Sequence, residues 1–212
     1  MIALTVSDMM DADAACMRIA ELIRRGRTLG VPDAVCIRND SFTLDPFRDM
    51  IILVKSLWTG DIVLESDDPG IMAEAVIPVM ERVPLIVGAN SGNLDHFIMI
   101  ARTFGCRMCV SESDPELLFD LIQRAESEDV KDLAIDPMMR NMKQCLEVCT
   151  DIRRLSASLP EAGHPLVVRT WSGEYAMSMA TVSMLVTDAI IITDDLDYDC
   201  CEVLGELRES VR

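Results

Sequence analysis

The sequence predicts an α/β protein built as a compact TIM (β/α)8 barrel, with residues 1–212 forming a single domain. Two observations predict this fold. Short runs rich in Val, Ile and Leu recur along the chain without regular polar and apolar alternation, which is typical of parallel strands covered on both faces. Segments with helical spacing separate these runs, so strand and helix alternate with a repeat of about 26 residues, near the lower length limit of such a barrel.

The eight apolar runs are expected to form the strands. They occupy residues 2–6, 34–38, 61–65, 84–89, 107–111, 132–136, 165–170 and 189–193. Aromatic residues make up only 4% of the chain, whereas Met occurs 15 times. The core around these strands is therefore expected to consist of aliphatic side chains and of Met, which fills irregular gaps.

The helices between the strands carry start and stop signals. Asp68 and Asp114 each precede a proline, an arrangement that predicts an N-cap followed by Pro at the first helical position. After the fourth strand, Ser91 is the predicted cap and Gly105 the predicted stop. Residues 136–155 repeat the Asp-Pro opening and are expected to form the sixth helix.

An open, doubly wound sheet is the alternative to the barrel, because it shows the same alternation of strand and helix. Such folds commonly carry a glycine-rich phosphate-binding turn after the first strand. The stretch LTVSDMMDAD at that place contains no glycine. The barrel is therefore favoured, and no linker or low-complexity tract divides the chain.

The charge and the N-terminus indicate where the protein works. The net charge of −17 would repel nucleic acids and anionic membrane surfaces. The longest apolar run, at residues 177–193, is interrupted by polar residues and is expected to be a buried helix and strand rather than a membrane span. Because no basic leader begins the sequence, we expect a cytoplasmic protein whose eight cysteines are reduced.

Neither the cysteines nor the histidines predict a metal site. Cys106 and Cys109 have the CxxC spacing, but a strand would point them to opposite faces, and no second CxxC is present. His96 lies within an expected helix, and His164 lies before a strand, at the end away from the expected site. Buried thiols and structural histidines are the simpler interpretation.

Polar residues gather where the expected strands end, which is where barrels bind their ligands. The candidate ligand-binding residues are Asp8, Asn39, Asp67, Asn90, Ser111, Asp136, Arg169 and Asp194. Asp40, Glu65, Glu112 and Asp195 belong to the same class. Each also lies near a helix start, where side-chain oxygens can cap free backbone N–H groups, so function and capping both stay open for Asn90, Asp136 and Arg169.

An ordered series of motifs suggests a family. The series comprises "SDDP", "PLIVGANSGN", "VKDLAIDP", "DIRRL" and a late "TD", and the similarity extends best over residues 60–196. In this order they resemble the barrel domain of the corrinoid iron–sulfur protein subunits of acetyl-CoA decarbonylase/synthase, the CO dehydrogenase/acetyl-CoA synthase system.

The resemblance implies a role in one-carbon metabolism. In that family the large subunit carries a corrinoid between a methyl donor on a tetrahydropterin and the metal cluster that makes acetyl-CoA. Its barrel packs against the cobalamin and against partner subunits. The large subunit also has a four-cysteine iron–sulfur motif and a corrinoid-binding domain, which this sequence does not match. The resemblance thus implies a barrel-only relative that binds a corrinoid, a corrinoid protein or other complex subunits, with no iron–sulfur cluster of its own; a homodimer stays open.

Two other functions remain open. A tetrahydropterin-dependent corrinoid methyltransferase would use Asp67, Asn90 and Asp136, a distribution that resembles pterin-binding methyltransferases, and there Asp136→Asn or Asn90→Ala should abolish tetrahydropterin binding. A barrel for an unrelated small metabolite would use Asp194 and Arg169, together with Asp195, and would favour a cationic ligand or divalent metal over a phosphate.

Overall fold

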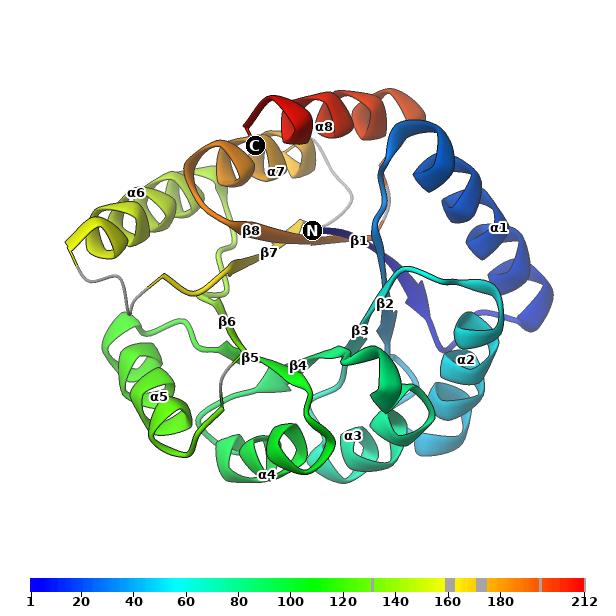
Figure 1. Ribbon diagram of the computed structural model, residues 1–212, viewed down its shortest axis with the longest axis horizontal. Helices are drawn as coiled ribbons and strands as arrows, with labels where there is room; N and C mark the ends of the chain where they lie inside the picture. The colour runs from blue at the N-terminus through cyan, green and yellow to red at the C-terminus, as the bar shows by residue number, and fades with distance from the viewer. Residues whose placement is uncertain (131, 159–162, 171–174, 195, 212) are drawn as a thin grey trace.

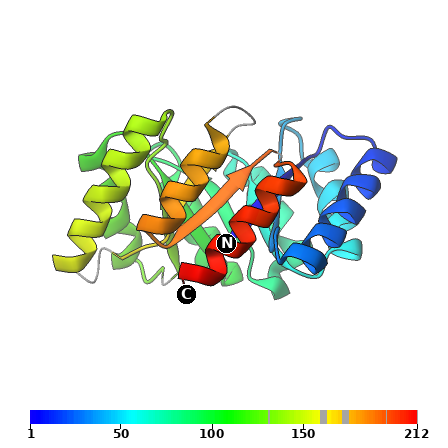
Figure 2. The same ribbon diagram turned by 90° about the horizontal axis from the view of Figure 1, so that it is seen from above.

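Parallel strands close into a barrel and helices surround it, as Figure 1 shows in a view along the shortest axis of the molecule. The computed structural model describes residues 1–130, 132–158, 163–170, 175–194 and 196–211. Figure 2 shows the helices inclined along the outside of the barrel. The predicted fold class is confirmed, and the alternative of an open sheet is excluded because the first and last strands pair.

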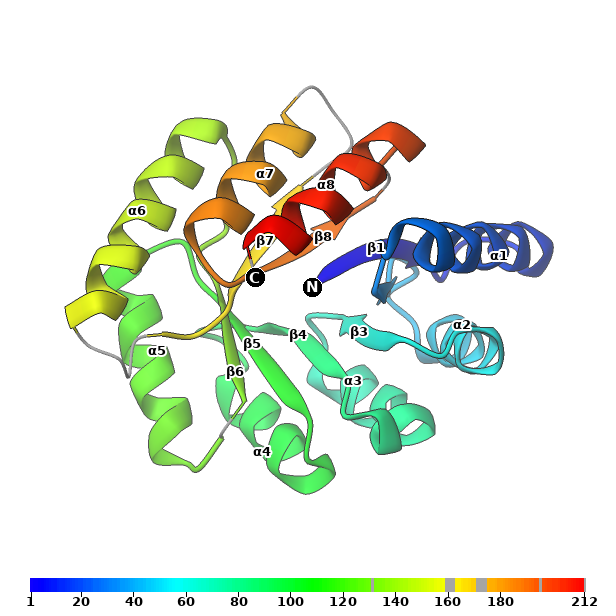
Figure 3. The ribbon, with the colours of Figure 1, turned by 45° about the horizontal axis from the view of Figure 1, so that its top comes forward.

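The eight strands agree with the predicted runs to within one residue at each end. They are β1 (Ile2–Ser7), β2 (Ala34–Arg38), β3 (Asp61–Glu65), β4 (Leu85–Ala89), β5 (Arg107–Ser111), β6 (Leu133–Asp136), β7 (Leu166–Thr170) and β8 (Ala189–Thr193). Each strand is parallel to its neighbours in the order of the sequence. Ile2 lies opposite Ile191, so β1 and β8 lie side by side and complete the ring (Figure 3).

Eight α-helices and one 3₁₀ helix lie within the described residues. They are α1 (Ala12–Leu29), α2 (Leu44–Leu57), α3 (Pro69–Val76), η1 (Ile77–Arg82), α4 (Leu94–Phe104), α5 (Pro115–Ser127), α6 (Met142–Ser158), α7 (Ala176–Val186) and α8 (Tyr198–Val211). The 3₁₀ helix η1 continues directly from α3 and was not predicted. Within the same residues, no helix combines the length and the apolar character that crossing a membrane requires.

The predicted helix caps are partly confirmed. Asp68 accepts hydrogen bonds from the N–H groups at the start of α3, and Asp114 does the same for α5. Gly105 ends α4 with φ of 67°, in the left-handed region that favours glycine. Ser91 was the wrong cap, because α4 begins only at Leu94 and Asn93 precedes it.

The sixth helix begins later than predicted. Asp136 is the last residue of β6, and the chain runs through a loop until α6 begins at Met142. Asn141 caps this helix by accepting a hydrogen bond from Gln144 N at 3.0 Å. Asp-Pro therefore opens a helix at Asp68 and Asp114 but not at Asp136, whose side chain has other partners.

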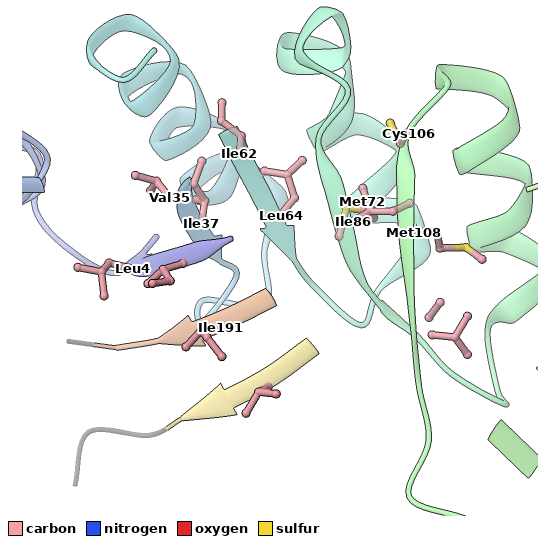
Figure 4. Close-up of a cluster of buried hydrophobic side chains, with 14 of the residues drawn as sticks. Leu4, Val35, Ile37, Ile62, Leu64, Met72, Ile86, Cys106, Met108 and Ile191 are labelled. Atoms are coloured by element: carbon pink, nitrogen blue, oxygen red, sulfur yellow. The ribbon is translucent and has the colours of Figure 1, made fainter. Parts of the chain in front are cut away.

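Strand alternation divides the core into two parts. Outward side chains such as Leu64, Ile86 and Met108 pack against the helices and form a large cluster (Figure 4). Inward side chains form a second cluster inside the barrel. Its members are Ala3, Ala34, Cys36, Val63, Leu85, Val87, Cys109, Ala134, Val167, Ile190 and Ile192. Cys106 belongs to the outer cluster and Cys109 to the inner one, as the alternation predicts.

Candidate functional site

The inward positions become polar at the carboxyl ends of the strands. Because inward and outward residues alternate along each strand, these polar side chains lie one layer above the apolar interior cluster. They are Arg38, Glu65, Ser111, Asp136, Arg169 and, just after β8, Asp194. We call this layer and the loops around it the carboxyl-end mouth.

Arg169 joins two opposite sides of the mouth. Its Nε–H donates to Asp136 Oδ2 at 2.7 Å on the neighbouring strand β6, and its Nη1–H donates to Glu65 Oε1 on β3. Strands β3 and β7 lie four positions apart in the ring of eight, so this second contact crosses the barrel. Burial lowers the pKa of Arg169, but the charges of Glu65 and Asp136 raise that pKa by more, so the guanidinium stays protonated. We call these three residues the Arg169 cluster.

Arg38 forms a second ion-paired group nearby. Its Nε–H donates to Asp40 Oδ1 at 2.8 Å and its Nη1–H to Asp194 Oδ1 at 2.7 Å. Burial lowers the pKa of Arg38, while hydrogen bonds to the two carboxylates raise it above its ordinary value. This Arg38 cluster, like the Arg169 cluster, contains two carboxylates and one guanidinium, so each carries a net charge of −1.

Two buried thiols lie beneath the Arg169 cluster. Cys36 Sγ donates to Glu65 Oε2 at 3.6 Å, and Cys109 is fully buried within the interior cluster. Burial raises the pKa of both thiols, the negative charge of Glu65 raises it further in both, and that of Asp136 also raises the pKa of Cys109. Both thiols are therefore neutral at pH 7 and are unsuited to act as nucleophiles or thiolate ligands.

Asp8 organises the loop that follows β2. Its carboxylate accepts hydrogen bonds from Asp40 N and Ser41 N, both at 2.9 Å, from Ser41 Oγ at 2.6 Å, and from Asn39 Nδ2 at 3.1 Å. Asp8 and Asn39 are both buried. The hydrogen bonds of these two predicted site residues thus shape the loop from within the chain.

Asn90 and Asp67 belong to neither ion-paired cluster. Asn90 closes its own turn, with Oδ1 accepting from Gly92 N at 2.9 Å and Nδ2 donating to Gly88 O at 3.1 Å. Asp67 is exposed, and its backbone carbonyl accepts a hydrogen bond from Asn93 Nδ2 at 2.9 Å. The structure therefore links Ser111, Asp136 and Arg169 to one another but leaves Asn90 outside that group.

The sequence analysis missed Arg38 and Asn93. Arg38 closes the apolar run AVCIR much as Arg169 interrupts LVVRT, and a charge on an otherwise apolar strand was the signal. Asn93 binds Asn90 N, Asp67 O and Gly88 O with its side chain, an arrangement for which the sequence carries no signal. Asp195 lies outside the described residues.

Exposed apolar side chains surround the mouth. They are Met9, Phe42, Met138 and Tyr175, in the segments after β1, β2, β6 and β7, and their exposed fractions range from 45% for Met138 to 81% for Phe42. We call them the apolar rim. Phe42 and Met138 have positive φ values of 54° and 52°, a backbone conformation that L-residues with side chains rarely adopt.

The opposite end of the barrel carries two hollows. One, of about 300 Å³, is lined by residues at the starts of β5 and β6, among them Cys106 and Asp132. The other, of about 410 Å³, is lined by His164 and Asp188 at the starts of β7 and β8. His164 Nε2 lies 3.0 Å from Glu126 Oε1, and no cluster of three or more potential metal ligands occurs among the described residues.

Comparisons with known proteins agree with this architecture. The chain matches the family model described as the CO dehydrogenase/acetyl-CoA synthase delta subunit over residues 1–208. The corrinoid/iron–sulfur protein large subunit of Moorella thermoacetica is 26% identical over 168 residues, covering 74% of this chain and 38% of that protein. The chain thus spans less than half the length of this relative.

Solved structures of dihydropteroate synthases share the fold. The enzyme from Coxiella burnetii, in complex with pteroic acid, gives a TM-score of 0.76 at 14% identity, covering 99% of this chain and 91% of that one. The enzyme from Vibrio fischeri ES114 gives 0.73 at 14% identity, covering 99% and 92%. At such low identity the likeness concerns the fold alone.

Proposed function

Since this chain belongs to the CO dehydrogenase/acetyl-CoA synthase delta subunit family, we propose that it binds a corrinoid protein through its carboxyl-end mouth in one-carbon metabolism. The corrinoid supplies a cobalt atom that carries a methyl group. The barrel supplies a binding surface and has no iron–sulfur cluster of its own. Other subunits of the same complex are its further partners.

The internal pairing of the charged groups that point into the mouth from the strand ends carries this proposal. A general acid or base must be free to exchange a proton with a substrate. Glu65 and Asp136 instead hold Arg169, and Asp40 and Asp194 hold Arg38. This arrangement favours binding over turnover.

The residues at the mouth fit the outside of a corrinoid protein better than the cobalt itself. Neither histidine belongs to the ion-paired clusters, since His96 is exposed in the first turn of α4 and His164 lies at the opposite end of the barrel. The thiols of Cys36 and Cys109 are buried and neutral. Within the described residues, the two ion-paired clusters contain no imidazole, and the thiols beneath them are neutral, which supports a partner that holds the corrinoid and a barrel that contacts the partner.

The test is an anaerobic titration of the chain with the corrinoid-binding domain of a corrinoid/iron–sulfur protein, followed by calorimetry and by the visible spectrum of the corrinoid. A parallel titration uses free methylcobalamin. Saturable binding of the corrinoid protein, with weaker or no binding of free methylcobalamin, is expected. If neither titration shows binding under anaerobic conditions, the proposed function is rejected.

A tetrahydropterin-dependent methyltransferase is our second proposal, and it requires two side chains of the mouth to change their hydrogen-bond partners. Asp136 and Asn90 would have to exchange their present partners, Arg169 and the turn around Gly88, for the pterin. Tetrahydropterin binding that disappears in both Asp136→Asn and Asn90→Ala would support it. Equal binding by the unaltered chain and both variants would rule out this use of the two side chains.

A further inference from the structure

We propose that Phe42 and Met138 are the two anchor points through which the mouth binds its corrinoid-protein partner, and that Asp8 and Asp136 are the positioning residues that hold them. The inference rests on the proposed function and specifies which side chains the partner contacts. Three features support this inference. Phe42 and Met138 are exposed and have strained backbones, they lie on opposite sides of the barrel, and the charged clusters lie between them.

The positive φ values of Phe42 and Met138 are not explained by the end of a helix. Four non-glycine residues have positive φ values in the described part of the chain: Phe42, Val83, Asp129 and Met138. Val83 and Asp129 each follow a helix end and bond back to it, which is a common role for a left-handed residue. Phe42 and Met138 lie in loops that lead from a strand to the next helix, where no helix ends.

Buried carboxylates hold both strained loops. Asp8 accepts from the N–H groups of Asp40 and Ser41, the two residues directly before Phe42. Asp136 Oδ1 accepts from Met138 N at 2.8 Å, while its Oδ2 accepts from Arg169. The side chain of Asp136 is only 2% exposed, so the loop position of Met138 is tied to the Arg169 cluster.

Burial of the rim side chains within this chain does not compensate for the strain. Phe42 leaves 81% of its surface exposed and Met138 leaves 45%. Backbone strain that surrounding groups hold in place is typical of binding sites, where it prepares a side chain for contact with a partner. Large apolar side chains at the centre of an interface are also the usual anchors of protein–protein binding.

The two anchors lie on opposite sides of the mouth. Phe42 follows β2 and Met138 follows β6, and these strands are four positions apart in the closed ring of eight. Between them lie the Arg38 and Arg169 clusters, which together carry a net charge of −2. A ligand that contacts both anchors must span the whole mouth. Such a span and charge fit a protein surface with basic groups between two apolar pockets.

The experiment compares matched pairs of variants of the full chain in the titration with the corrinoid-binding domain. Phe42→Ala is paired with Phe119→Ala, which removes an exposed Phe from α5, and Met138→Ala is paired with Met99→Ala on α4. Phe42→Ala and Met138→Ala should each raise the dissociation constant at least tenfold, whereas both controls should change it less than twofold. Asp8→Asn should weaken binding, and Ser41→Ala should weaken it less. Circular dichroism and thermal unfolding check that every variant is folded.

The outcomes separate the inference from the proposed function. If the unaltered chain binds the domain but Phe42→Ala and Met138→Ala bind equally well, the inference fails and the proposed function stands. If the unaltered chain does not bind the domain at all, both fail. If the two variants lose binding of free methylcobalamin but keep that of the domain, the anchors contact the cofactor and the inference is overturned. If a variant is unfolded, Phe42→Gly and Met138→Gly, which suit the left-handed backbone, replace it and decide the question.

Discussion

Arg169 Nε–H donates to Asp136 Oδ2 at 2.7 Å between neighbouring strands, while the other oxygen of the same carboxylate accepts from Met138 N. One buried carboxylate therefore connects the ion pair that closes the barrel interior to a strained residue of the apolar rim. Polar residues at the strand ends can therefore shape the apolar rim through hydrogen bonds within the chain.

Replacing Arg169 should destabilise the fold strongly. Arg169→Met leaves Glu65 and Asp136 without their cation in a largely buried site, which should lower the free energy of unfolding by about 3 kcal/mol. Glu65→Gln in the same chain should restore part of the loss, because one uncompensated charge is removed. Urea denaturation at pH 7 measures both changes.

An exposed ion pair provides the control for Arg169. Arg102 and Glu128 are both 53% exposed, and Arg102→Met should cost less than about 1 kcal/mol. If Arg102→Met and Arg169→Met reduce the free energy of unfolding equally, the mouth cluster is not the stabilising feature described here.

Glycine at position 42 should stabilise the protein. A left-handed backbone costs a residue with a side chain about 1–2 kcal/mol, and glycine loses about 0.5–1 kcal/mol through the entropy of its unfolded state. Phe42→Gly should therefore raise the free energy of unfolding by about 0.5–1 kcal/mol. Phe119→Gly, within α5, should lower it by about 0.5 kcal/mol, so thermal unfolding should move in opposite directions for the two variants.

Asn93 rather than Ser91 should matter at the start of α4. The Asn93 side chain makes hydrogen bonds of 2.7, 2.9 and 3.0 Å to Asn90 N, Asp67 O and Gly88 O. Asn93→Ala should cost about 2 kcal/mol in the free energy of unfolding, whereas Ser91→Ala, at an exposed turn position, should change it by less than about 0.5 kcal/mol. The reverse order in chemical denaturation would contradict the description of this turn.

Alkaline pH should destabilise the fold through the interior thiols. The folded-state pKa values of Cys36 and Cys109 are raised. Their contribution to the free energy of unfolding is therefore complete below the unfolded pKa of about 8.5 and is lost as pH rises above it. Each thiol should account for about 2 kcal/mol of lost stability between pH 8 and pH 10. Unfolding of Cys36→Ala/Cys109→Ala should therefore depend less steeply on pH in this range.

A cavity control separates titration from packing in that experiment. Val63→Ala removes an inward apolar side chain from the same interior cluster without removing a thiol. It should lower stability by a similar amount at pH 8 and pH 10. A pH dependence of the Cys36→Ala/Cys109→Ala variant that equals that of the unaltered chain would contradict the assignment to these thiols.

Features that depend on nearby residues were predictable from the sequence. The eight apolar runs gave the strands to within one residue, since a parallel strand buried on both faces needs a short continuous apolar segment. Asp68 and Asp114 were correct as caps because a cap bonds to residues two or three positions away. The same rule failed at Asp136, whose oxygens bind Arg169 of β7 and the loop residue Met138.

By itself, the sequence determined an alternation of strands and helices and placed polar residues at the strand ends. Only the tertiary structure decided which of those residues meet. Glu65 and Arg169 are 104 positions apart in the chain and touch because ring closure sets β3 opposite β7 and strand alternation turns both side chains inward. Asn90 stays apart although it also follows a strand, because its amide closes a local turn. Local patterns depend on neighbours in the chain, whereas the contacts of the mouth depend on the geometry of the closed ring.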